Sequence, residues 1–103
     1  MLQRIQQEHF QSLLGKVIAL LLPDGSQLPI VIESVPLRPK SQLPGNERMP
    51  FGVALHTLEP TLFVDGLCAI ELPDLGRVED IFVSREPAMG RDDTLGYFNI
   101  VFN

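Results

Sequence analysis

The sequence predicts a mainly β fold, in which a six-stranded antiparallel meander closes into a small barrel or sandwich and carries one N-terminal helix. Nine prolines and eight glycines among 103 residues imply frequent chain reversals rather than long helices. After residue 16, apolar residues form short strand-like runs, several of them alternating with polar residues. The length and the 45% hydrophobic content fit a single domain, residues 1–103, with one core.

The N-terminal helix is predicted over about residues 3–14. Ile5, His9 and Leu13 recur there every three to four residues, which is typical of one face of a helix. Gly15 is expected to end the helix, because glycine readily adopts the left-handed conformation that follows a helix. On this helix we expect His9 to be partly buried.

A first hairpin is predicted from the strands Lys16–Leu22 and Gln27–Val35. The turn between them contains Pro23-Asp24-Gly25. Proline fixes the φ angle that suits the first turn position, and glycine accepts a positive φ. The turn chemistry therefore predicts that these two strands pair antiparallel.

Four further strands are predicted: Phe51–Leu58, Leu67–Leu72, Arg77–Arg85 and Tyr97–Phe102. The turn Pro73-Asp74-Leu75-Gly76 joins the second and third of these strands. We expect strands that follow one another in sequence to be neighbours in the sheet. By their positions, the aromatic residues expected mostly inside are Phe51, Phe82, Phe98 and Phe102, and those expected to be accessible are Phe63 and Tyr97.

The connection at residues 36–50 is the strongest candidate for a recognition surface. It contains four prolines, which block sheet hydrogen bonds and favour extended backbone, and it is the most basic segment. A connection of this length in a small domain is usually functional or disordered. Apolar residues within it must either fold back over the barrel end or meet a partner. The residues predicted to contact a protein partner are Arg38, Lys40, Leu43, Arg48 and Met49.

The net charge of −5 argues against two classes of partner. Residues 51–103 hold three basic and nine acidic side chains, whereas nucleic-acid binding requires a cationic surface. An anionic membrane surface would repel the same half of the chain. The longest apolar run, Val17–Leu22, is also far shorter than the roughly 20 residues that span a bilayer. We therefore expect a protein partner, with no nucleic-acid or membrane binding.

No recognisable catalytic motif is present, so we predict no catalytic, cofactor-binding or metal-binding residue and no enzymatic activity. Strand alternation is expected to send Glu79 and Asp80 to opposite faces, which prevents them from acting as an acid–base pair. The single cysteine, Cys68, lies in an apolar strand and is expected to be a buried hydrophobic residue. Two alternatives stay open. One is a small ligand-binding barrel or hydrolase that uses His56 and nearby carboxylates, and the other is a structural subunit of a homo-oligomer.

The expected location is the cytoplasm. One cysteine cannot form an intrachain disulfide, and residues 1–9 lack the apolar segment of a secretory leader.

Several motifs resemble those of a bacterial family of uncharacterised small β-rich domains. They are Phe10-x-x-Leu-Leu-Gly15, Pro23-Asp24-Gly25 and the terminal Val101-Phe102-Asn103, and the resemblance extends from about residue 10 to the end. The resemblance implies a shared fold and transfers no catalytic residue. It also implies an accessory or adaptor protein associated with a bacterial secretion (type VI-like) or phage-tail-like assembly. The sequence therefore predicts a non-enzymatic protein-binding module.

Overall fold

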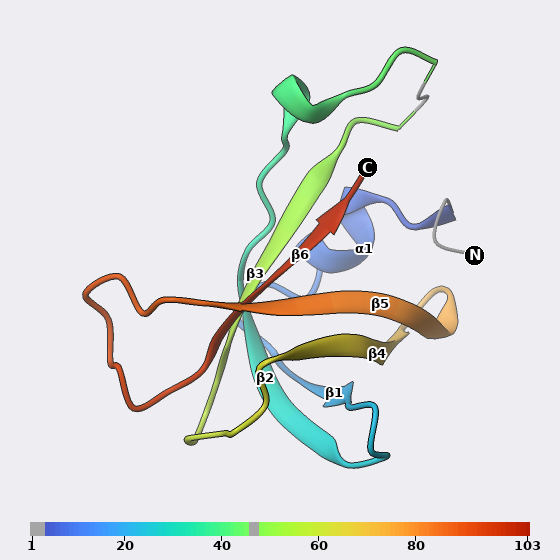
Figure 1. Ribbon diagram of the computed structural model, residues 1–103. Coiled ribbons are helices and arrows are strands. Elements are labelled where there is room, and N and C mark those ends of the chain that lie inside the picture. The colour runs from blue at the N-terminus through green and yellow to red at the C-terminus, as the bar shows by residue number, and fades with distance from the viewer. Residues whose placement is uncertain (1–3, 46–47) are drawn as a thin grey trace.

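Six antiparallel strands form a closed barrel in the computed structural model, which describes residues 4–45 and 48–103 (Figure 1). Each strand lies within two residues of its predicted position, so the mainly β fold is confirmed and the barrel is the correct alternative. The strands are β1 (Val17–Leu21), β2 (Gln27–Ser34), β3 (Phe51–Thr57), β4 (Asp65–Leu72), β5 (Gly76–Glu86) and β6 (Tyr97–Phe102).

The order of strands around the barrel is β1-β2-β3-β6-β5-β4, and β4 closes the barrel against β1. The prediction of a simple meander is wrong here, because β3 pairs with β6 instead of β4. This pairing runs the length of β6 and places Val53 opposite Ile100 and Leu55 opposite Phe98, all four of which are buried. The non-local pairing joins two apolar strands, and residues 58–64 cross to β4 in a Greek-key connection.

The first hairpin forms as the turn sequence predicts. The carboxylate of Asp24 accepts hydrogen bonds from the backbone N–H and the hydroxyl of Ser26, at 2.9 and 2.6 Å. Gly25 adopts a φ of 88°, a conformation that costs glycine little. The turn brings Leu21 opposite Gln27 and so sets the register of β1 and β2.

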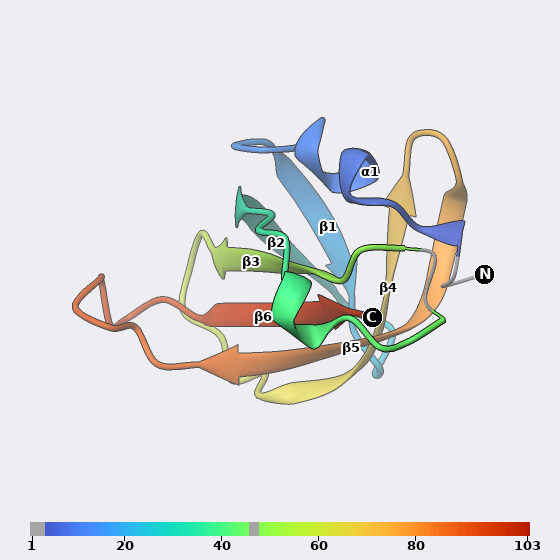
Figure 2. The ribbon, with the colours of Figure 1, turned by 90° about the horizontal axis from the view of Figure 1, so that it is seen from above.

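Apolar side chains fill the barrel interior, and three aromatic rings close one end. The rings of Phe51 and Phe102 stack with centroids 4.9 Å apart, and Phe10 lies 5.5 Å from Phe102. Phe10 belongs to α1 (Gln7–Gln11), which lies over this end of the barrel (Figure 2). Burying these rings attaches the N-terminal segment to the barrel.

α1 is shorter than the predicted helix of about residues 3–14, whose first residue lies outside the described part of the chain. It begins after Gln6, whose backbone N–H donates to Nδ1 of His9 at 2.8 Å. Ile5 lies outside the helix and is fully buried. At the other end, Leu14 forms a bridge with Ile32 instead of continuing the helix. Tertiary contacts thus override helical periodicity at both ends.

A short 3-10 helix, η2 (Pro39–Ser41), is an element the sequence did not predict.

A bulge where β4 pairs with β5 changes which residues of β5 face outward. The register shifts between Cys68 and Ile70, and Asp80 has a φ of 60°. Val78 is buried, whereas both Glu79 and Asp80 are exposed, so the prediction that these acids face opposite sides is wrong. After the bulge, the residues of β5 that point into the core are odd-numbered, and the even-numbered ones point outward. Phe82 therefore faces outward instead of into the core, where it was expected.

None of the helices in residues 4–45 and 48–103 has the length and apolar character needed to cross a membrane.

Candidate functional site

Residues 36–50 form a projecting hairpin, called here the 36–50 hairpin. At its base the N–H of Gly52 donates to the carbonyl of Pro36 at 2.8 Å, and the N–H of Arg38 donates to that of Pro50 at 2.7 Å. The hairpin rises from the barrel beyond β3 (Figure 1). Two residues of the predicted connection, 46 and 47, lie outside the described residues. The base bonds hold the hairpin in a defined direction relative to β3.

Apolar and basic side chains are exposed together on the 36–50 hairpin. Leu43 is 60% exposed, and Leu37 and Met49 are also exposed. Arg38 and Lys40 are exposed as well, on the same part of the hairpin as Leu37. These apolar side chains therefore present surface to the solvent, and basic charge accompanies them.

Arg48 differs from the other predicted contact residues because its guanidinium is bound within the chain. Nη1 donates to the carbonyl of Ile5 at 2.6 Å, and Nε donates to the carbonyl of Asn103 at 3.1 Å, to which Nη2 also donates. Its Cζ lies 5.7 Å from the ring centroid of Phe51 and 5.8 Å from that of Phe102. Desolvation lowers the pKa of Arg48 from its ordinary value. Arg48 thus ties the hairpin to both terminal segments.

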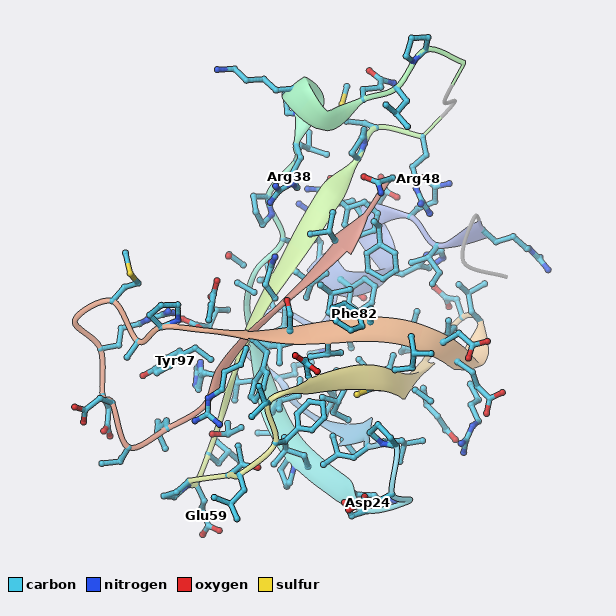
Figure 3. The ribbon with its side chains drawn as sticks, viewed as in Figure 1. Asp24, Arg38, Arg48, Glu59, Phe82 and Tyr97 are labelled. Atoms are coloured by element: carbon cyan, nitrogen blue, oxygen red, sulfur yellow. The ribbon has the colours of Figure 1, made fainter. Side chains whose placement is uncertain are left out.

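Arg38 and Arg48 lie on opposite sides of the hairpin base (Figure 3). The structure brings four of the five predicted contact residues to exposed positions on one projecting element: Arg38, Lys40, Leu43 and Met49. The structural role of Arg48 depends on backbone carbonyls that are far away in sequence. The residues around position 48 therefore could not predict it.

A second group of polar residues surrounds His56 on the outside of the barrel. Nδ1 of His56 lies 3.3 Å from a carboxylate oxygen of Glu33, and Nη1 of Arg91 lies 2.9 and 3.1 Å from the two oxygens of that carboxylate. Arg91 also covers Tyr97, with its Cζ 3.9 Å from the ring centroid. Tyr97 is therefore buried, and its predicted accessibility is wrong. These contacts fix residues 87–96 against the barrel.

The geometry around His56 gives no support to the alternative of a ligand-binding barrel or hydrolase. Apolar side chains occupy the barrel interior, and His56 lies on its outer face. The Glu33 carboxylate already binds Arg91 through both oxygens. Across the described ranges, no three His, Cys, Asp or Glu side chains gather as a metal-binding group.

A family model for a domain of unknown function (DUF6916) matches residues 5–102. The chain belongs to this family. The DUF6916 match covers all six strands and the 36–50 hairpin, and it confirms the resemblance to an uncharacterised domain family. No curated protein and no solved structure gives a significant match.

The single cysteine of this DUF6916 domain is a buried core residue. The Cys68 side chain is 3% exposed, and its Sγ lies 3.7 Å from the carbonyl oxygen of Gly66. Desolvation raises the pKa of the Cys68 thiol to about 11, from a reference value of 9.0. A thiol with a raised pKa is a poor nucleophile near neutral pH. Cys68 therefore contributes packing rather than chemistry.

The raised pKa of Cys68 predicts a stability change at alkaline pH. The folded-state pKa lies above the unfolded-state value, so the contribution of the neutral thiol is complete below about pH 9 and falls as the pH rises from about 9 to about 11. We expect wild type to lose more free energy of unfolding than Cys68→Ala over this range. Urea unfolding of both proteins at several pH values measures the difference, because the other titrating groups are common to both. Parallel pH curves would contradict the prediction.

Proposed function

We propose that this domain is a non-enzymatic protein-binding accessory module whose contact element is the 36–50 hairpin. One observation carries the proposal: Leu37, Leu43 and Met49 are exposed on a projecting hairpin whose base is fixed by backbone hydrogen bonds. Exposed apolar side chains that gather on one element are typical of interaction sites. A fixed base reduces the entropy that binding would otherwise cost.

The chemistry of the hairpin suggests the chemistry of the partner. Arg38 and Lys40 lie beside apolar side chains, so a complementary partner surface is apolar with acidic groups near it. The accessory role in a bacterial secretion or phage-tail-like assembly, and the cytoplasmic location, belong to this proposal. The support for that role is the sequence resemblance described above.

Loss of two hairpin side chains tests the proposal. We expect the Lys40→Glu/Leu43→Ser variant to capture its partner at least about tenfold more weakly than wild type. A tenfold loss requires only about 1.4 kcal/mol of binding free energy, which the loss of two contact residues can supply. Both side chains are exposed, so the melting temperature should stay within about 2 °C of the wild-type value. Quantitative mass spectrometry of proteins captured from the source cells by each immobilised variant measures the change.

Leu62→Ser provides the matched control for this test. Leu62 is 98% exposed and lies in the connection between β3 and β4, away from the hairpin. The control should capture the same proteins as wild type in the same amounts. Equal capture by wild type and the hairpin variant would contradict the proposed role of the hairpin.

A further inference from the structure

A second exposed surface lies on the outer side of β4 and β5 and combines apolar with acidic side chains. It is called here the β4–β5 face and consists of Leu67, Glu79, Asp80 and Phe82. Leu67 and Phe82 are directly opposite each other in the strand register, and both are more than half exposed. Residues directly opposite in an antiparallel pair lie close enough for their side chains to form one surface. Beside this pair is a hollow of about 370 Å³, lined by Leu67, Glu79 and Asp80 among other residues.

The bulge in β5 creates the β4–β5 face. Strict alternation from the buried Val78 would send Asp80 and Phe82 into the core, but both are exposed. The change requires Asp80 to adopt a φ of 60°, a conformation that is uncommon outside glycine. Bulges often redirect a side chain for a purpose other than packing. Here the bulge places a phenylalanine on the surface, where large aromatic residues commonly dominate binding energy.

The β4–β5 face is acidic as well as apolar. Glu79 forms an ion pair with Arg77 at 3.0 Å. Within residues 4–45 and 48–103, Asp80 has no ion-pair partner within 4 Å. An unneutralised carboxylate therefore lies next to Leu67 and Phe82. A ligand that fits this surface carries apolar and basic groups close together.

The 36–50 hairpin of the same chain carries that combination of groups. We propose that the hairpin of one molecule docks on the β4–β5 face of a second copy, with Leu43 against Phe82 and Lys40 near Asp80. The hairpin extends from the barrel away from β4 and β5 (Figures 1 and 3), so the contact is between molecules. The inference rests on the proposed role of the hairpin as a binding element and adds the identity of one partner.

The proposed contact joins two different surfaces, so it is head-to-tail. After one contact, one copy keeps an unused face and the other keeps an unused hairpin, so further copies can add to form a ring or an open chain of molecules. An interface that used the same patch on both copies would stop at a dimer. This difference allows a test that separates the two geometries.

The test combines a hairpin variant with a face variant. The hairpin variant is Lys40→Glu/Leu43→Ser, and the face variant is Asp80→Asn/Phe82→Ser. Asparagine tolerates the positive φ at residue 80, so the face variant removes charge and apolar area while preserving the bulge. Circular dichroism and thermal unfolding check that both variants fold, and Leu62→Ser is again the control.

Sedimentation velocity over a concentration series measures association. We expect the average mass of wild type and of Leu62→Ser to rise above 11.5 kDa with concentration, whereas each variant alone stays at that mass. An equimolar mixture of the two variants should form a complex of twice the monomer mass and nothing larger. In that mixture only one intact hairpin meets one intact face, so chain growth stops after one contact.

Three results would overturn the inference: a monomeric wild type at the highest concentration reached, association by either variant alone, or no complex in the mixture. None of them depends on the capture experiment. If the hairpin variant fails to capture a different protein while wild type remains monomeric, the proposed function stands and self-association is wrong.

Discussion

Replacement of Phe51 by alanine should lower the free energy of unfolding by about 3–5 kcal/mol, the range typical of a fully buried phenylalanine. The ring is fully buried, stacks on Phe102 at 4.9 Å and lies 6.3 Å from Phe10. Its loss leaves a cavity where the barrel, the N-terminal segment and Arg48 meet. Because these parts belong to different elements, they cannot collapse together to fill the space.

Urea unfolding followed by circular dichroism measures this loss. Phe82→Ala is the matched control, because it removes the same atoms from a side chain that is 55% exposed, and it should change stability by less than about 1 kcal/mol. Similar losses in the two variants would show that Phe51 does not occupy the core position described here.

Arg48→Met should lower the free energy of unfolding by about 2–3 kcal/mol. Methionine retains much of the apolar length of arginine but cannot donate to the carbonyls of Ile5 and Asn103. Hydrogen bonds that involve a charged group contribute about 1.5–3 kcal/mol, and solvent access at Asn103 limits the total. For a domain of this size, the loss corresponds to a decrease in melting temperature of about 10 °C.

Arg38→Met is the control for this substitution, because Arg38 is an exposed arginine at the same hairpin base. Its melting temperature should stay within about 2 °C of the wild-type value. Equal decreases for the two variants would contradict the anchoring role of Arg48. The pair also shows why substitutions that probe partner binding should leave Arg48 intact, since its loss would change the hairpin and the fold together.

The sequence predicted the strands well because local chemistry decides where they end. Pro23, Gly25 and Pro73 mark turns through their own backbone preferences, which need no knowledge of the rest of the chain. The projecting element at residues 36–50 was found for the same reason, since prolines exclude it from the sheet. Contact of that element with a partner remains a prediction.

Errors arose where simple alternation along the chain does not decide the outcome. Phe82 was expected inside because alternation continues by default, and one extra residue at the Asp80 bulge reversed it. Tyr97 was expected to be accessible, but Arg91 from the preceding connection covers its ring. The pairing of β3 with β6 and the contacts of Arg48 depend instead on residues far away in sequence. Such contacts leave no periodic signal in a single sequence.

The bonded base of the 36–50 hairpin has a consequence for how this fold can diversify. The bond between Gly52 and Pro36 and the contacts of Arg48 tie the hairpin to the rest of the chain, and the bond between Arg38 and Pro50 closes its base. Residues between these points can change in number at a small entropic cost, because doubling the length of a flexible loop costs only about 0.6 kcal/mol. The hairpin tip can thus be exchanged for another recognition sequence, and the barrel becomes a carrier for grafted binding segments.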